Sequence, residues 1–237
     1  MHLSRITFQN DAYPTKDSYP FSLALFQRTE QIVLTSPVTF FVGENGTGKS
    51  TLLEAIALRS GIHIWRGLRR TRCDVNPYED ELYRFLRMEW DNGMVPGSFF
   101  GADIFRNFAQ NLDEWSAMDP GMLKYFGGKS LMSQSHGQSL MSYFRTRYNI
   151  KGLYLLDEPE TALSPKSQLA LLELLHTVSQ MGHAQFIVAS HSPILLACPD
   201  AHILDFNRLP LSSIDYEDTE YFKIYRDFLN NRKKYLS

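Results

Sequence analysis

The sequence predicts an α/β fold in which parallel strands carry polar residues at one edge of a sheet. Three apolar runs have the length and bulky composition of buried strands: Val38–Val42, Leu153–Leu156 and Phe186–Ala189. They are followed by a glycine-rich segment, a pair of carboxylates and a histidine, respectively. Parallel strands place their carboxyl ends at the same sheet edge, where ligands bind in such folds, so we expect these groups to lie together.

The first 35 residues contain three short β-like runs: Leu3–Phe8, Phe21–Phe26 and Gln31–Thr35. Each run is rich in the bulky residues that favour strands. We expect them to form an N-terminal antiparallel β-layer beside the strand at Val38–Val42.

The glycine-rich segment is GENGTGKST, residues 43–51, which fits the phosphate-binding pattern G-x-x-x-x-G-K-[ST]. A helical pattern follows it, so its glycines and the free N–H groups of the helix start would form an anion site. Lys49 adds a mobile positive charge for the β- and γ-phosphates, and Ser50 offers a hydroxyl to Mg²⁺. The residues expected to bind the nucleotide are Gly43, Asn45, Gly46, Thr47, Gly48, Lys49, Ser50 and Thr51.

The second and third strands end in candidate catalytic residues. We expect Asp157 to reach the Mg²⁺, directly or through a water, and Glu158 to orient and polarise the water that attacks the γ-phosphate. Such a pair alone would indicate a solvated strand end, and the phosphate-binding loop in the same chain favours the catalytic interpretation. His191 follows the third strand at the same edge, where it can hydrogen-bond the γ-phosphate or the attacking water.

Residues from about 60 to 147 carry no second chemical motif before a polar segment at Gln134–Gln138, and we interpret them as a mainly helical insert lobe. The core lobe would then comprise residues 1–59 and 148–237, in one domain spanning 1–237. Ser164 and Pro165 are expected to start a helix with apolar positions Leu169, Leu172 and Leu175. A last helix is expected over Glu217–Leu229, with an apolar stripe that is either a packing face or a partner site: Tyr221, Ile224, Tyr225 and Phe228.

Composition narrows the class of protein. The chain has 237 residues, 43% hydrophobic and 21% charged, which is typical of a soluble globular protein. The net charge of −2 gives no overall attraction to nucleic acid or membrane. Cys73 and Cys198 suit free thiols in a reducing cytoplasm. The chain lacks the apolar core of a signal peptide and a run of about 18 apolar residues, so we expect a cytoplasmic location without membrane insertion.

Five motifs occur in the order typical of the ABC-type ATPase head, and the chain resembles that family. The carrying segments are GENGTGKST, SQSHGQS, LYLLDEPETALS and ASHSP. In the family they are the phosphate loop, the signature, the second acidic motif with the D-loop, and the switch histidine. The sequences of these segments resemble those of a group of small stand-alone ATPases that are labelled AAA but are ABC-like. That group is similar to the SMC and RecF heads and to phage-defence ATPases. The resemblance implies a P-loop NTPase fold, with ATP and Mg²⁺ as ligands.

The resemblance also implies a homodimer that forms on ATP binding. In such heads two copies meet head to tail, and each ATP lies between the phosphate loop of one copy and the signature of the other. Ser135, Gly137 and Gln138 would contact that nucleotide, with His136 in place of the family's glycine. Because Ser135 precedes a helical pattern, its hydroxyl and the neighbouring N–H groups would form a second anion site.

Two residues expected from the family pattern are not assigned: the Mg²⁺-binding glutamine and the aromatic residue that stacks on adenine. The stretch Pro96–Asp103, where a Mg²⁺-binding glutamine would be expected, contains none; Asp103 and Gln110 are weak substitutes. Tyr13 and Tyr19 both precede the phosphate loop at distances that suit an aromatic residue stacked on adenine. Each also lies beside a proline and could equally be a turn tyrosine.

The leading functional hypothesis is an ATPase whose dimerisation cycle regulates DNA processing or a defence effector. The alternatives are a weakly hydrolysing ATP-dependent adaptor for a separately encoded partner, and the ATPase subunit of a transporter. One basic cluster could bind DNA, or could be a solvated helix end balanced by nearby acidic residues. It comprises Arg59, Arg66, Arg69, Arg70 and Arg72.

Overall fold

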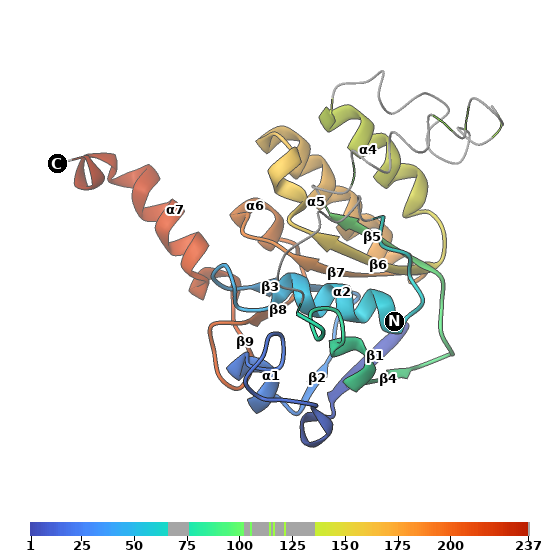
Figure 1. The fold of residues 1–237 in the computed structure, drawn as a ribbon. Helices are drawn as coiled ribbons and strands as arrows, with labels where there is room; N and C mark the ends of the chain where they lie inside the picture. The colour runs from blue at the N-terminus through green and yellow to red at the C-terminus, as the bar shows by residue number, and fades with distance from the viewer. Residues whose placement is uncertain are drawn as a thin grey trace.

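The protein is described by a computed structural model that covers residues 1–65, 76–101 and 136–236, together with residues 105, 114, 116 and 121. In this part of the chain a six-stranded sheet has the order β5-β6-β7-β3-β8-β9 (Figure 1). Its strands are β5 (Gly97–Gly101), β6 (Gly152–Asp157), β7 (Ala184–Ala189), β3 (Val38–Val42), β8 (His202–Asp205) and β9 (Ser212–Ser213). Neighbouring strands are parallel except β8 and β9. The three motif strands are thus adjacent in the predicted parallel sheet.

A second, three-stranded sheet is antiparallel and has the order β2-β1-β4. Its strands are β2 (Gln31–Val33), β1 (Leu3–Phe8) and β4 (Leu86–Trp90). The predicted N-terminal antiparallel layer is therefore confirmed, but the strand predicted at Phe21–Phe26 is wrong. That stretch leads into the short helix α1 (Ala24–Arg28), and its fully or nearly buried residues, Phe21, Leu25 and Phe26, follow a helical rather than an alternating spacing.

Helices cover both faces of the large sheet. They are α2 (Lys49–Arg59), α4 (His136–Arg147), α5 (Pro165–Gln180) and α6 (Pro193–Leu196). The last helix, α7 (Glu220–Asn230), does not lie on the sheet. Shorter 3₁₀ turns are η1 (Asn10–Ala12), η2 (Leu82–Phe85), η4 (Pro159–Ala162), η5 (Tyr216–Asp218) and η6 (Arg232–Tyr235). Alternate residues of the central strands enter two different apolar clusters. Phe40 packs with residues of α4, α5 and α6, whereas Phe41 packs with α2 and the antiparallel sheet. Burial on both faces explains why these strands are continuous apolar runs.

The two sheets are joined by one buried amide. Gln185 of β7 is fully buried, and its Oε1 accepts from the backbone N–H groups of His2 (2.9 Å) and Leu3 (2.8 Å). Its Nε2 donates to the Leu3 carbonyl at 2.8 Å. The Gln185 side chain therefore links the start of β1 to the start of β7.

Some expectations differ from the structure in detail. Strands β4 and β5 both fall within the 60–147 segment that we expected to be mainly helical, and β5 pairs with β6 of the core sheet. The division into a core lobe and an insert lobe otherwise stays a prediction. Helix α5 begins at Pro165 as expected. Of its predicted apolar positions, Leu175 is buried, Leu172 is partly buried and Leu169 is 56% exposed. The other buried apolar residues of α5 are Leu171 and Val178.

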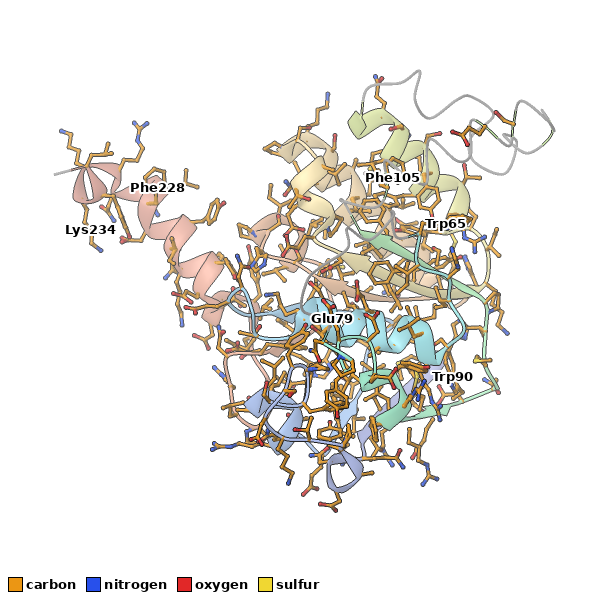
Figure 2. The ribbon with its side chains drawn as sticks, viewed as in Figure 1. Trp65, Glu79, Trp90, Phe105, Phe228 and Lys234 are labelled. Carbon is orange, nitrogen blue, oxygen red and sulfur yellow. The ribbon has the colours of Figure 1, made fainter. Side chains whose placement is uncertain are left out.

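Helix α7 extends away from the rest of the molecule (Figure 1). Figure 2 shows Phe228 and Lys234 near its outer end, remote from the side chains of the main body. The predicted apolar stripe is largely exposed, with 48% exposure for Ile224 and 52% for Tyr225. Tyr221 and Phe222 in the first turn are partly covered, and beyond them Asp227 is the one partly covered residue of α7. Within the described residues, the structure contains no helix that is both long and apolar enough to cross a membrane.

Candidate functional site

The phosphate-binding loop joins β3 to α2 and closes around a buried lysine. Gly48 precedes α2 in a left-handed conformation with φ of 100°, which an L side chain rarely adopts. The Lys49 side chain is only 4% exposed, and its Nζ donates to the carbonyls of Gly43 and Glu44, both at 2.8 Å. Burial lowers the pKa of Lys49, whereas the nearby carboxylates of Glu158 and Asp157 raise it. A buried cation beside free helix N–H groups is well suited to bind phosphate.

Some of the remaining loop residues are exposed at the outer rim, and others make hydrogen bonds that support the loop. Asn45 and Gly46 are exposed at the rim. Thr47 Oγ1 donates to the Glu44 carbonyl at 2.9 Å, which tightens the loop. Thr51 is half-buried on α2, and its Oγ1 shares a short hydrogen bond with the Tyr19 hydroxyl.

Ser50 and Asp157 meet where a Mg²⁺ ion would be expected. Ser50 lies in the first turn of α2, and its Oγ donates to Oδ1 of Asp157, the last residue of β6, at 3.0 Å. Burial raises the pKa of Asp157 to about 7, while the Ser50 hydrogen bond lowers it. In the described residues no group of three or more His, Cys, Asp or Glu side chains could hold a metal ion. One carboxylate and one hydroxyl still fit Mg²⁺, which usually binds through few protein ligands together with substrate phosphates.

Glu158 and His191 also face each other at this edge. Glu158 Oε1 lies 3.1 Å from His191 Nε2, and the two side chains are 37% and 23% exposed. The Glu158 backbone is left-handed, with φ of 46°, which is uncommon for a residue other than glycine. Its N–H donates to the Ala189 carbonyl at 3.0 Å, so the end of β7 holds this conformation in place. The structure therefore brings these two predicted residues together, while their roles stay predictions.

Two further residues complete the arrangement, and sequence reasoning did not assign them to the site. Glu160 Oε1 accepts from the His191 N–H at 2.5 Å, and burial raises the pKa of this carboxyl, opposed by that hydrogen bond. Tyr221 of α7 donates its hydroxyl proton to the Gly43 carbonyl at 2.9 Å and also contacts His191 Nδ1. Glu160 could have been suspected from its place beside the acidic pair. Tyr221 had been interpreted only as part of an apolar helix face.

Two of the residues predicted to form the signature line a different groove. Gly137 and Gln138 are in the first turn of α4, half-buried and exposed respectively. They line a groove together with Ala162, Ser164 and residues of the first turn of α5. Ser164 caps α5 by accepting from the Ser167 N–H at 3.3 Å. Several other predicted residues lie outside the described part of the chain: Ser135, Asp103, Gln110, Arg66, Arg69, Arg70, Arg72 and Cys73.

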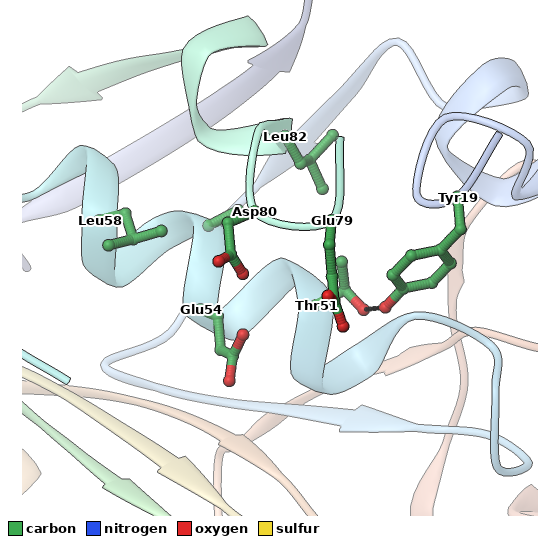
Figure 3. A pocket seen from close by; sticks show the side chains of 8 residues that line it. Tyr19, Thr51, Glu54, Leu58, Glu79, Asp80 and Leu82 are labelled. Atoms are coloured by element: carbon green, nitrogen blue, oxygen red, sulfur yellow. Dashed lines mark hydrogen bonds between the residues drawn. The ribbon is translucent and has the colours of Figure 1, made fainter. Parts of the chain in front are cut away.

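The two tyrosines considered for adenine stacking have different surroundings. The Tyr13 ring packs 4.6 Å from that of Phe21, its hydroxyl donates to the Phe26 carbonyl, and burial raises its pKa. Tyr19 is 42% exposed and turns toward Thr51 on the helix that follows the phosphate loop (Figure 3). Tyr19 is therefore the better placed of the two, beside a small pocket lined by the acidic residues Glu54, Glu79 and Asp80.

Comparison with known proteins gives a consistent picture. Residues 121–197 match the family model described as "AAA domain, putative AbiEii toxin, Type IV TA system", and residues 21–59 match one described as "AAA domain". The hemin import ATP-binding protein HmuV of Rhodopseudomonas palustris is 29% identical over 178 residues, covering 68% of this chain and 67% of that protein. The thiamine import ATP-binding protein ThiQ of a Ruegeria species is 28% identical over 168 residues, covering 64% and 69%.

The fold is also similar to that of a solved structure. That structure, of cbiO1 from Clostridium perfringens, part of the ABC transporter complex cbiONQ, has a TM-score of 0.53 at 17% sequence identity. The superposition covers 99% of this chain and 98% of that one, and it concerns the fold alone. The two family matches and this likeness in fold agree with a P-loop NTPase fold and with the resemblance to ABC-type ATPase heads.

Proposed function

We propose that the chain hydrolyses ATP and that ATP closes two copies into a head-to-tail dimer. The observation that carries the proposal is that five residues lie at one sheet edge: Lys49, Ser50, Asp157, Glu158 and His191. Ser50 contacts Asp157, Glu158 contacts His191, and Lys49 lies in the phosphate loop near both carboxylates. Gly137 and Gln138 line a separate groove, beside the first turn of α5. A second copy that brings this groove to the phosphate loop would complete the contacts to the γ-phosphate.

Each residue of this edge has a defined task in the proposed reaction. Lys49 and the N–H groups of the loop bind the β- and γ-phosphates of ATP. A Mg²⁺ ion held by Ser50 and Asp157 would neutralise charge that develops on the phosphate oxygens. The Glu158 carboxylate accepts a hydrogen bond from the attacking water and orients it in line with the γ-phosphate. His191 reaches the same region with Nε2, which in this structure faces Glu158.

The test of dimer closure uses Glu158→Gln, which keeps the shape of the side chain and removes its charge. With saturating ATP and Mg²⁺ we expect light scattering to give twice the 27.3 kDa monomer mass. The double variant Lys49→Ala/Glu158→Gln is the matched control, because it should not hold the phosphates and should stay monomeric. A Glu158→Gln protein that remains monomeric under these conditions would contradict the proposed dimer.

A second measurement tests which process the ATPase cycle regulates. We propose regulation of DNA processing or of a defence effector, and test it by ATP hydrolysis with and without linear duplex DNA at low salt. Strong stimulation that is lost in Arg69→Glu/Arg70→Glu would support the DNA version.

The alternative is that the chain works with a separately encoded protein, as an adaptor or as the ATPase of a transport system. It is favoured by the relatives, which are named as ATP-binding proteins of hemin and thiamine import. A slow basal rate that DNA leaves unchanged would support this alternative over the DNA version.

A further inference from the structure

Tyr221 connects the C-terminal helix to two parts of the site that are distant in sequence. It lies in the first turn of α7, which Thr219 caps by accepting from the Phe222 N–H at 3.4 Å. The Tyr221 hydroxyl donates to the Gly43 carbonyl of the phosphate loop at 2.9 Å and contacts Nδ1 of His191. The Tyr221 and His191 rings also meet edge to face, with centroids 5.0 Å apart at an interplanar angle of 77°. One side chain thus touches both the phosphate loop and the histidine.

The donors and acceptors in this chain of contacts fix the position of one proton. A carbonyl oxygen can only accept, so the single hydroxyl proton of Tyr221 goes to Gly43. The Tyr221 oxygen is then an acceptor toward His191, and Nδ1 must carry a proton. In this ring orientation Nε2 lies 3.1 Å from Glu158 Oε1.

We propose that Tyr221 is a positioning residue for His191, holding Nδ1 protonated and the ring turned so that Nε2 faces Glu158. The proposal rests on the proposed function, in which His191 acts at the γ-phosphate of ATP. The His191 backbone is fixed separately, through the bond from its N–H to Glu160. That bond leaves rotation of the imidazole about its Cβ–Cγ bond unrestrained, and the Tyr221 hydroxyl supplies the restraint on Nδ1.

The same contact links the site to the position of α7. Beyond Phe222 the helix is exposed apart from a partly covered Asp227, so the first turn carries the attachment to the body of the protein. Any displacement of that turn removes the hydroxyl from both Gly43 and His191. The orientation of the histidine therefore depends on where α7 begins.

The decisive variant is Tyr221→Phe, which keeps the ring and removes only the hydroxyl. We expect kcat for ATP to fall roughly 10- to 100-fold, as for the misplacement of a catalytic group, while KM stays within about twofold. Tyr225→Phe is the matched control, since Tyr225 lies one turn further along α7 and is 52% exposed. Its kcat should equal that of the parent.

A double-mutant comparison asks whether Tyr221 acts through the histidine. In single-turnover measurements, adding Tyr221→Phe to His191→Ala should cost less than about twofold beyond His191→Ala alone. Full additivity of the two losses would overturn the proposal, and so would a Tyr221→Phe enzyme with unchanged kcat.

A spectroscopic measurement separates this proposal from the proposed function. Long-range ¹H–¹⁵N spectra of histidine-labelled protein, assigned by comparison with His191→Ala, report which ring nitrogen is protonated. We expect a protonated Nδ1 in the parent and in Tyr225→Phe, and a changed pattern in Tyr221→Phe. An unchanged pattern in Tyr221→Phe refutes the positioning role even if ATP hydrolysis is lost. The expected pattern in a parent that does not hydrolyse ATP supports the positioning role and refutes the proposed function.

Discussion

Substitution of Gly48 by alanine tests how the phosphate loop obtains its shape. Gly48 has φ of +100°, and a Cβ atom there would lie 2.9 Å from Phe26 Cζ and 3.0 Å from Leu23 Cδ1. Phe26 is fully buried, so its ring has little room to move. Gly46 also has a positive φ, +82°, but a Cβ there would meet nothing within 4 Å. The two positions therefore separate backbone strain from steric conflict.

The expected magnitudes follow from these two terms. A left-handed conformation costs an L residue about 1–2 kcal/mol, and overpacking of a closed site costs about 1–3 kcal/mol more. Gly46→Ala should therefore lower the free energy of unfolding by about 1–2 kcal/mol, and Gly48→Ala by about 2–5 kcal/mol. Gly182→Ala is a control far along the chain, since Gly182 has φ of +75° and open space around its Cβ position.

The assay is urea unfolding followed by circular dichroism, with the nucleotide affinity of each folded variant measured separately. Gly182→Ala gives the strain cost in this protein, and Gly46→Ala should match it. If Gly48→Ala is no more destabilising than Gly182→Ala, the contact with Phe26 and Leu23 does not constrain the loop and the argument fails. Gly46→Ala can still weaken ATP binding, because Gly46 lies on the exposed rim of the loop.

Three further predictions concern catalysis, sheet pairing and thiol reactivity. Glu158→Ala should lower ATP turnover by about 10²–10⁴-fold with binding of a fluorescent ATP analogue retained, and persistent turnover would contradict its role. Gln185→Leu leaves two backbone N–H groups unpaired, so urea unfolding should show a loss of about 3 kcal/mol or more, against little change for Gln180→Leu on the exposed end of α5. Burial raises the pKa of Cys198 to about 11. In a Cys73→Ser background, thiol labelling of Cys198 should therefore be slow at pH 8 and should become faster as the pH approaches 11. Rapid labelling of the folded protein at pH 8 would refute this prediction.

The motif strands could be predicted because each has two signals in its own sequence: a buried apolar run and the polar residues that follow it. Strands β3, β6 and β7 have mostly apolar residues on both faces, because one face packs on α4 and α5 and the other on α2. Such strands belong inside a sheet, and the polar residues that follow them fall at one edge. The prediction that Ser50 and Asp157, 107 residues apart, lie at one sheet edge agrees with their contact at 3.0 Å.

Other features depend on contacts that no local pattern specifies. The third strand of the antiparallel sheet, β4 (Leu86–Trp90), is far in sequence from its partner β1 (Leu3–Phe8), and its own five residues could not predict that pairing. The run Phe21–Phe26 has strand-like composition, but its aromatic rings pack against Tyr13 and the loop at Gly48, which favours a turn and a short helix. Tyr221 belongs to an amphipathic pattern, and its second role arises only from where α7 begins.

The acidic motif and the histidine loop behave as one structural unit, and this affects how variants at the site should be interpreted. The Glu158 N–H donates to Ala189, the His191 N–H donates to Glu160, and the two side chains meet at 3.1 Å. Three contacts thus join two short segments, and one of them supports the left-handed backbone of Glu158. A change on either segment should displace the other, so the effects of paired substitutions here should fall short of additivity. Tyr221 then extends the unit to the phosphate loop, because the same hydroxyl that contacts His191 donates to Gly43.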